Sequence, residues 1–170
     1  MANNNYTTNQ INIYTIRYYS SNTVQHCDRG NYNMVMNPWY LTGFVEAERC
    51  FTLGITRNNK CKTGWSIQLF FQIDFFFEKD KYLLDQIKNY FDDGKIYKHS
   101  TQCIIYRVLS IKDLQVIIDH LVKYPIITQK LADFNLFNQA FNLTLNKEHL
   151  TIIGLKKLVA IKRSWVFHQS

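Results

Sequence analysis

Two acidic residues, Glu46 and Glu48, close a short segment that begins with residues typical of a helix start. Asn37 can accept a hydrogen bond from a free backbone N–H as an N-cap, and Pro38 suits the first helical position, where its missing donor costs nothing. A carboxylate at the end of a helix is unfavourable, because the helix dipole is already negative there. A divalent cation bound from outside the chain would explain Glu48, so this residue is the first indication of a metal site.

A strip of small residues runs along the same predicted helix. Gly43 and Ala47 are separated by one helical turn and therefore lie on one face, which another helix could approach backbone to backbone. We predict that this face is a helix-pairing interface, either with a second copy of the chain in a homodimer or with a second repeat.

Two predicted strands follow this helix and form a hairpin. Apolar and polar residues alternate from Phe51 to Thr56 and again from Trp65 to Asp74, and residues 57–60 have the composition of a turn. One face of the hairpin therefore carries short hydroxyl and amide side chains, which can read base edges in a major groove. An ordinary solvated face is the alternative, although such a face usually carries more Lys and Glu.

The rest of the chain alternates between helical and strand patterns. Apolar spacing predicts a helix over 79–91, strands over 95–99 and 102–109, and helices from Ser110 to about Tyr124, from Thr128 onward and from about Thr151 to Arg163. This order indicates an α+β fold in which antiparallel β-hairpins are backed by helices on one face. We expect residues 1–36 to be an extended or poorly ordered leader, residues 37–164 to be the domain, and residues 165–170 to be a tail.

Composition narrows the possible partners. The net charge of +7 and the pI near 9.2 favour a polyanion, and 46% hydrophobic residues exclude a disordered chain. The four cysteines form no Cys-x-x-Cys pair, which argues against structural zinc. No run of about 18 apolar residues is present, so we expect no membrane-spanning segment.

The segment Leu41-Thr42-Gly43-Phe44-Val45-Glu46-Ala47-Glu48 resembles the motif of LAGLIDADG homing endonucleases, in which two such helices pack side by side. Residues 71–74, 94–98, 124–141 and 148–162 resemble one repeat from the organelle-intron branch of that family. The resemblance covers roughly positions 37 to 163 and implies a saddle-shaped sheet that sits on a duplex. A single repeat makes half of such a saddle.

The resemblance also implies an activity, the Mg²⁺-dependent cleavage of both DNA strands. By that resemblance Glu48 is a catalytic carboxylate and metal ligand, the carbonyl of Ala47 is its companion, and Lys130 stabilises charge near the scissile phosphate. Without the family, a solvated lysine is the simpler interpretation of Lys130. The expected nucleic-acid-binding residues are Thr52, Thr56, Arg57, Asn58, Lys60, Ser66, Gln68, Gln72, Asp74, Lys95, Tyr97 and His99. Tyr97 and Tyr106 could also stack on unpaired bases if the ligand were RNA.

Three features depart from the family pattern. Arg49 replaces the usual Gly after the catalytic acid, where it would either repel a metal ion or pair with Glu48. Phe75 to Phe77 stand where relatives often have Gln or His, and residues 165–170 replace an Asn- and Gly-rich continuation. These departures keep an alternative open, a non-catalytic RNA-binding intron maturase or an organellar, ribosome-associated structural protein. A biased composition, rich in Asn, Ile, Lys, Phe and Tyr, together with the family resemblance, favours a mitochondrial protein.

Overall fold

The computed structural model describes residues 36–48, 50–75, 81–100 and 103–168. The leader expected over residues 1–36 lies outside these residues except for Met36. Arg49 and residues 76–80, which include Phe76 and Phe77, also lie outside them.

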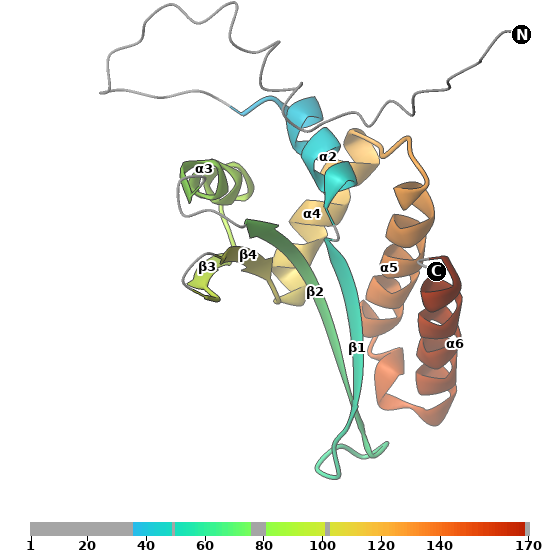
Figure 1. The fold of residues 1–170 in the computed structure, drawn as a ribbon. Helices are drawn as coiled ribbons and strands as arrows, with labels where there is room; N and C mark the ends of the chain where they lie inside the picture. Colours follow the sequence, from blue (N-terminus) through green and yellow to red (C-terminus); the bar gives the residue numbers. More distant parts are fainter. Residues whose placement is uncertain (1–35, 49, 76–80, 101–102, 169–170) are drawn as a thin grey trace, which may run out of the picture. The chain divides into compact units, whose positions relative to one another are not determined.

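The described elements follow the predicted order of helix, two strands, helix, two strands and three helices, so the predicted α+β class is confirmed (Figure 1). A short 3-10 helix, η3, is the only addition within the described part of the chain. The elements are α2 (Pro38–Ala47), β1 (Phe51–Arg57), β2 (Trp65–Phe75), α3 (Lys81–Phe91), β3 (Lys95–Lys98), β4 (Ile104–Val108), α4 (Ile111–Lys123), α5 (Lys130–Leu145), η3 (Glu148–Leu150) and α6 (Ile152–His168).

The four strands form one antiparallel sheet in the order β1-β2-β4-β3. Alternation places the odd-numbered residues of β1 and β2 on one face, and most of these are buried, such as Leu53, Phe71 and Ile73. The even-numbered residues of the hairpin lie on the other face, as predicted, because successive side chains of a strand point in opposite directions.

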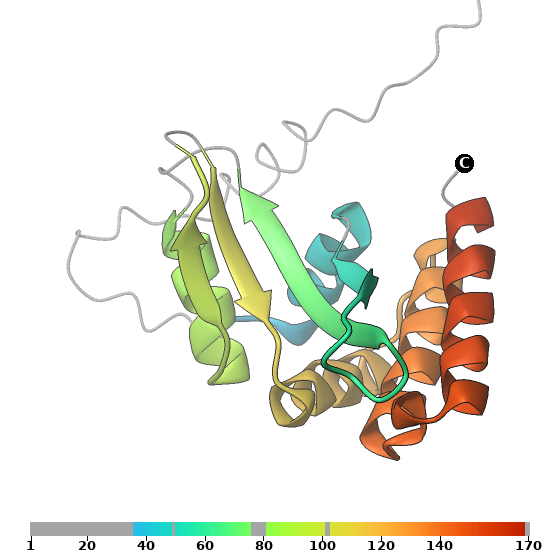
Figure 2. The same ribbon diagram turned by 90° about the horizontal axis from the view of Figure 1, so that it is seen from below.

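The helices pack against the apolar face and complete the core. Phe51 at the start of β1 contacts Phe134 and Phe137 of α5, with ring centroids 5.8 and 5.0 Å apart. Figures 1 and 2 show α5 and α6 side by side next to β1, with α3 close to the β3–β4 hairpin. No helix in the described part of the chain is long and apolar enough to span a membrane.

Helix α2 begins as its sequence predicts. The Asn37 side chain accepts a hydrogen bond from the backbone N–H of Trp39 at 2.9 Å, and Pro38 occupies the first turn. Leu41 and Val45 are fully buried in the core. The helix is therefore anchored along one side, while its other side is exposed.

Helix α6 is longer than predicted. It continues to His168 instead of ending near Arg163, and Trp165 is only 3% exposed. The Trp165 ring packs edge-on against Phe137, 6.2 Å between centroids. Burial of this large aromatic side chain explains why the helix continues into residues that were expected to be a tail.

Tyr106 was expected as a possible base-stacking residue, and this expectation is wrong. Its side chain is fully buried, and its hydroxyl donates to the carbonyl of Asp93 at 3.0 Å. The ring lies against Gly94, where a Cβ would come within 2.6 Å of Tyr106 Cε2, and Gly94 also has φ of 78°. Alternation decides this outcome, because Tyr106 pairs with Ile73 and Ile96 on the core face.

Candidate active site and nucleic-acid interface

Glu48, Asp74 and Lys130 lie close enough for their charges to interact, and we call them the acid–lysine cluster. Glu48 is the C-cap residue of α2, Asp74 lies near the end of β2, and Lys130 is the first residue of α5. Burial raises the pKa of Glu48, the positive charge of Lys130 opposes this rise, and the negative charge of Asp74 adds to it. The structure thus joins the two residues predicted as catalytic, although they are far apart in the sequence.

The Lys130 ammonium group is buried, and among the described residues none accepts a hydrogen bond from its Nζ atom. A buried cation without a full set of acceptors is costly, because it has lost its water without replacement. Such a group has strong unused capacity to bind an anion. A phosphate oxygen at the edge of the cluster would supply the missing acceptor.

Cys50 lies beneath the cluster and takes no part in its chemistry. The side chain is buried, its Sγ atom donates to the carbonyl of Val45 at 3.6 Å, and burial strongly raises the pKa of the thiol. A protonated, buried thiol is inert, so Cys50 serves as packing between α2 and β1.

The donors near Glu48 fit a metal ion that shares its coordination with a substrate. Among the described residues, no group of three or more His, Cys, Asp or Glu side chains could hold a metal ion alone. Mg²⁺ keeps several waters and commonly uses one or two carboxylates together with phosphate oxygens. The Glu48 carboxylate and the carbonyl of Ala47 at the end of α2 are donors of this kind. The adjacent carboxylate of Asp74 adds negative charge that favours a cation there.

The open face of the sheet carries most of the predicted nucleic-acid-binding residues. Strand pairing brings Thr56 opposite Ser66 and Gly54 opposite Gln68, and the Gln68 side chain is exposed on the same face. Tyr97 is 41% exposed on β3. The predicted residues that this face brings together are Thr52, Thr56, Ser66, Gln68, Gln72, Asp74, Lys95 and Tyr97.

Arg107 is a central residue of this face that was not predicted. It pairs with Gln72 on one side and with Lys95 on the other, so three polar side chains cross the sheet in one row. Its Nε atom donates to Gln72 Oε1 at 2.6 Å, and its guanidinium lies 4.9 Å from the ring centroid of Phe70. The alternation of β4 placed Arg107 on the face opposite Tyr106 and Val108, but its neighbours across the sheet were needed to show its importance.

Gln72 connects this row to the acid–lysine cluster. Its Nε2 atom donates to Asp74 Oδ1 at 2.6 Å while its oxygen accepts from Arg107. A continuous line of hydrogen bonds therefore leads from the middle of the open face to the cluster, and it fixes the orientation of each side chain along the way.

The remaining predicted contacts lie at the ends of the strands. Arg57 falls on the opposite face of β1 from Thr52 and Thr56, although it is exposed at the tip. The side-chain Oδ1 atom of Asn58 accepts from the Lys60 backbone N–H at 3.0 Å and stabilises the turn. Figure 1 shows this turn at the end of the hairpin farthest from α2. His99 is exposed just after β3.

The predicted helix-pairing face of α2 is open. Gly43 and Ala47 are exposed, and a Cβ placed on Gly43 would have no heavy atom of the described chain within 4 Å. Trp39 and Tyr40 on the same helix are 56% and 52% exposed. This surface remains available to a partner helix.

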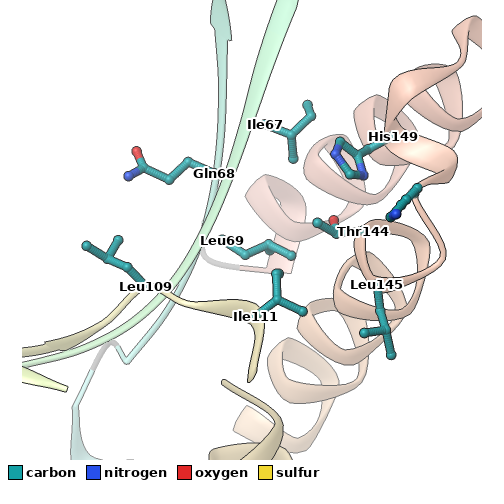
Figure 3. A pocket seen from close by; sticks show the side chains of 9 residues that line it. Ile67, Gln68, Leu69, Leu109, Ile111, Thr144, Leu145 and His149 are labelled. Atoms are coloured by element: carbon teal, nitrogen blue, oxygen red, sulfur yellow. The ribbon is translucent and has the colours of Figure 1, made fainter. Parts of the chain in front are cut away.

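A pocket of about 460 Å³ lies between the middle of β2 and the end of α5 (Figure 3). Its lining is mainly apolar, and the buried His149 Nδ1 atom has no hydrogen-bond partner among the described residues. The residues that line the pocket are Ile67, Gln68, Leu69, Leu109, Ile111, Thr144, Leu145, Lys147 and His149. Lys130 is at the other end of α5, about 20 Å away along a helix of this length, so the pocket is separate from the cluster.

Comparison with known proteins agrees with this architecture. The family model described as "LAGLIDADG endonuclease" matches residues 41–141. An uncharacterized 50.9 kDa protein in ND4 intron 1 of Podospora anserina is 45% identical over 117 residues, which are 68% of this chain and 26% of that protein. Probable intron-encoded endonuclease 3 of Neurospora crassa is 41% identical over 136 residues, 79% of this chain and 25% of that protein. The chain thus spans about a quarter of the length of these two curated relatives.

Solved structures give the same result. The LAGLIDADG meganuclease I-CpaMI, bound to uncleaved DNA, has a TM-score of 0.72 and 46% identity, covering 75% of this chain and 43% of that chain. The homing endonuclease I-TnaI has a TM-score of 0.71 and 30% identity, covering 75% of this chain and 86% of that chain. The fold is the open-sheet α+β fold of LAGLIDADG meganucleases. The chain belongs to the LAGLIDADG endonuclease family, because the family model matches more than half of it.

Proposed function

We propose that this chain supplies one half of a homing endonuclease, which binds duplex DNA across the open sheet face and cleaves it with Mg²⁺. The observation that carries the proposal is the acid–lysine cluster, which lies at one end of a polar, arginine-containing sheet face. Relatives named as probable intron-encoded endonucleases and meganuclease structures bound to DNA support the same function.

DNA binding rests on the shape and chemistry of the open face. A two-stranded ribbon fits a major groove, and the hydroxyl, amide and guanidinium groups of Ser66, Gln68 and Arg107 suit base edges. The chain's net charge of +7 favours approach to a polyanion. No observation favours the RNA-binding alternative over DNA.

Cleavage would use the residues of the cluster in distinct roles. Glu48 and the carbonyl of Ala47 would hold Mg²⁺, which when bound supplies an activated water and stabilises the leaving oxygen. The Lys130 ammonium would bind the scissile phosphate and balance the charge that develops on it. Asp74, fixed by Gln72, would accept a hydrogen bond from a water beside that phosphate.

The second half of the enzyme would dock on the Gly43 and Ala47 strip of α2. Small residues allow two helices to approach closely, and a two-fold arrangement would place two clusters on opposite DNA strands. The second half is either another copy of this chain or a second repeat. The match to 43% of I-CpaMI and 86% of I-TnaI is compatible with both arrangements.

We also propose a mitochondrial origin, because matched relatives are named after an ND4 intron and a Cox1 intron.

Arg49 follows Glu48 in the sequence, and a fixed cation next to Glu48 would weaken metal binding and so oppose cleavage. Arg49→Gly should therefore strengthen Mg²⁺ binding in calorimetry, and unchanged binding would show that Arg49 points away from the site.

Selection from a randomised duplex DNA library tests the proposal, because the target sequence is unknown. The chain should enrich a defined, pseudo-palindromic sequence in Ca²⁺ and cut that sequence on both strands when Mg²⁺ replaces Ca²⁺. Structured RNA of equal length is the matched competitor. Enrichment of a sequence without any cleavage in Mg²⁺ would overturn the enzymatic part, and preferential binding of the RNA would overturn the DNA-binding part.

A further inference from the structure

Helix α2 is fastened at two points to the connector between α4 and α5, residues 124–129. Thr42 Oγ1 donates to the carbonyl of Tyr124 at 3.0 Å, where α4 ends. Glu46 Oε1 accepts from the backbone N–H of Ile127 at 2.7 Å and from that of Thr128 at 3.3 Å, just before α5 begins. Thr42 and Glu46 are one helical turn apart, so one side of α2 holds both ends of the connector.

The connector leads directly to the lysine of the cluster. Ile126 is buried and fixes the middle of the connector, whereas the side chain of Ile127 is 85% exposed. The backbone conformation at Ile127 therefore depends on its hydrogen bond to Glu46 rather than on packing of the Ile127 side chain. Thr128 Oγ1 in turn accepts from the backbone N–H of Lys130 at 3.3 Å. Each contact constrains the backbone within two residues of the next.

A carboxylate is well suited to this contact. Ile127 and Thr128 lie just before Gln129, the N-cap of α5, where the positive end of the helix dipole favours an anion. Hydrogen bonds to an ionised acceptor are also stronger than those between neutral groups. Glu46 therefore holds the start of α5 more firmly than a neutral side chain would.

The position of this start matters because Lys130 has a long, flexible side chain. Its ammonium group is buried beside Glu48 rather than extended into water. A shift of the backbone at residues 127–129 would move the whole side chain, and small displacements of a group that acts on a reacting phosphate reduce the rate strongly.

We propose that Glu46 is a positioning residue, which acts through the backbone of Ile127 and Thr128 to hold Lys130 in the cluster. Its consequence for cleavage rests on the proposed function, whereas its effect on Lys130 does not. Helix α2 would then supply one active-site acid directly, Glu48, and hold the active-site lysine through the other, Glu46.

Chemical labelling of Lys130 tests this proposal without relying on cleavage. The full chain is treated briefly with N-hydroxysuccinimidyl acetate, and acylation of Lys130 is measured by peptide mass spectrometry. The buried ammonium of Lys130 should be protected in the native chain. Glu46→Ala should increase its labelling about tenfold or more, as expected when hydrogen bonds to a charged acceptor are lost.

Two further variants and one exchange measurement make the result specific. Glu148→Ala breaks the exposed ion pair with Lys157, 2.8 Å long, and should leave Lys130 protected. Glu46→Gln retains a neutral acceptor and should give intermediate labelling. Amide hydrogen exchange of Ile127 and Thr128 should accelerate in Glu46→Ala and not in Glu148→Ala.

If the native chain cleaves DNA, Glu46→Ala should lower the single-turnover rate about 10- to 100-fold at saturating DNA, with Kd changed less than about twofold. If it cleaves none, the proposed function fails, but labelling and exchange still decide the role of Glu46. Labelling of Lys130 in folded Glu46→Ala equal to that in Glu148→Ala would overturn the proposal. Should Glu46→Ala not fold, the same comparison with Glu46→Gln decides.

Discussion

The acid–lysine cluster and the open sheet face are adjacent but are built in different ways. Residues of the cluster come from the ends of α2, β2 and α5, are partly buried, and depend on contacts between distant segments. Residues of the open face come from two hairpins, and the alternation of the strands alone orients most of them. A reacting group needs a fixed position, whereas a recognition surface needs accessible, exchangeable side chains.

This difference predicts that binding and cleavage are separable. Changes in the cluster should reduce the rate of cleavage with little effect on affinity, because they leave the open face intact. Changes on the open face should do the reverse. The experiments on Lys130 and Arg107 can break that separation, and the experiment on His120 tests the stability of the fold beneath both regions.

Among the substitutions at Lys130, His120 and Arg107, Lys130→Met should have the largest effect on cleavage. The substitution keeps the length of the apolar stem and removes the charge that would balance the phosphate, so the single-turnover rate should fall about 100- to 1000-fold. Affinity measured by fluorescence anisotropy in Ca²⁺ should change less than about twofold to threefold. An equal loss of affinity and rate would show that Lys130 contributes to general DNA binding only.

His120 is a buried histidine that contacts Thr42 of α2, and it should make the stability of the fold depend on pH. The side chain is 7% exposed and lies between Thr42, Tyr90 and Tyr124, and burial lowers its pKa to about 4. Because the Thr42 hydroxyl donates to the Tyr124 carbonyl, its oxygen accepts from His120 Nε2 at 3.2 Å. The other ring nitrogen, Nδ1, then accepts from the Tyr90 hydroxyl at 3.0 Å. The histidine is therefore neutral in the fold.

The unfolded chain binds a proton at His120 near pH 6.5, and the folded chain does so only near pH 4. Stability is therefore lost as pH falls through this window, by about 2 kcal/mol between pH 7 and pH 5 from this residue. Urea unfolding at the two pH values measures the loss, and His120→Gln should lower the stability at pH 7 and reduce the pH dependence. An equal pH dependence in that variant would assign the loss to other groups.

Arg107→Ala should have the smallest effect and the opposite character. It removes a guanidinium that Gln72 and the Phe70 ring hold in place on the open face, so affinity should fall about tenfold. The cleavage rate at saturating DNA should remain within about threefold, as expected for a contact made equally before and during reaction. A matched control is Lys112→Ala, an exposed residue that belongs to helix α4 and not to the sheet. A large fall in the saturated rate would show that the line of hydrogen bonds through Gln72 and Asp74 controls the cluster.

The two regions also differ in how well the sequence predicts them. Alternation in Phe51–Thr56 and Trp65–Asp74 predicts the open face, and the Asn37-Pro38 pair predicts the start of α2, because both patterns are local. Proximity of Glu48 to Lys130 was predicted only through family resemblance, since no local pattern relates residues that distant in the chain. The same reason explains why Glu46 and Arg107 received no role, and why the burial of Trp165 was missed: each depends on a segment far away in sequence. The burial of Tyr106 follows instead from the alternation of β4, which places Tyr106 on the face opposite Arg107.

The central claim is that Glu48 acts in cleavage and not in binding. The most direct test is the single-turnover cleavage rate and the Kd of Glu48→Gln, measured beside the native chain on the DNA sequence enriched by selection. We predict that cleavage falls by on the order of 1000-fold or more, because the carboxylate that would hold Mg²⁺ is lost, while Kd in Ca²⁺-free buffer stays within about threefold. A Glu48→Gln variant that cleaves at the native rate would contradict the account.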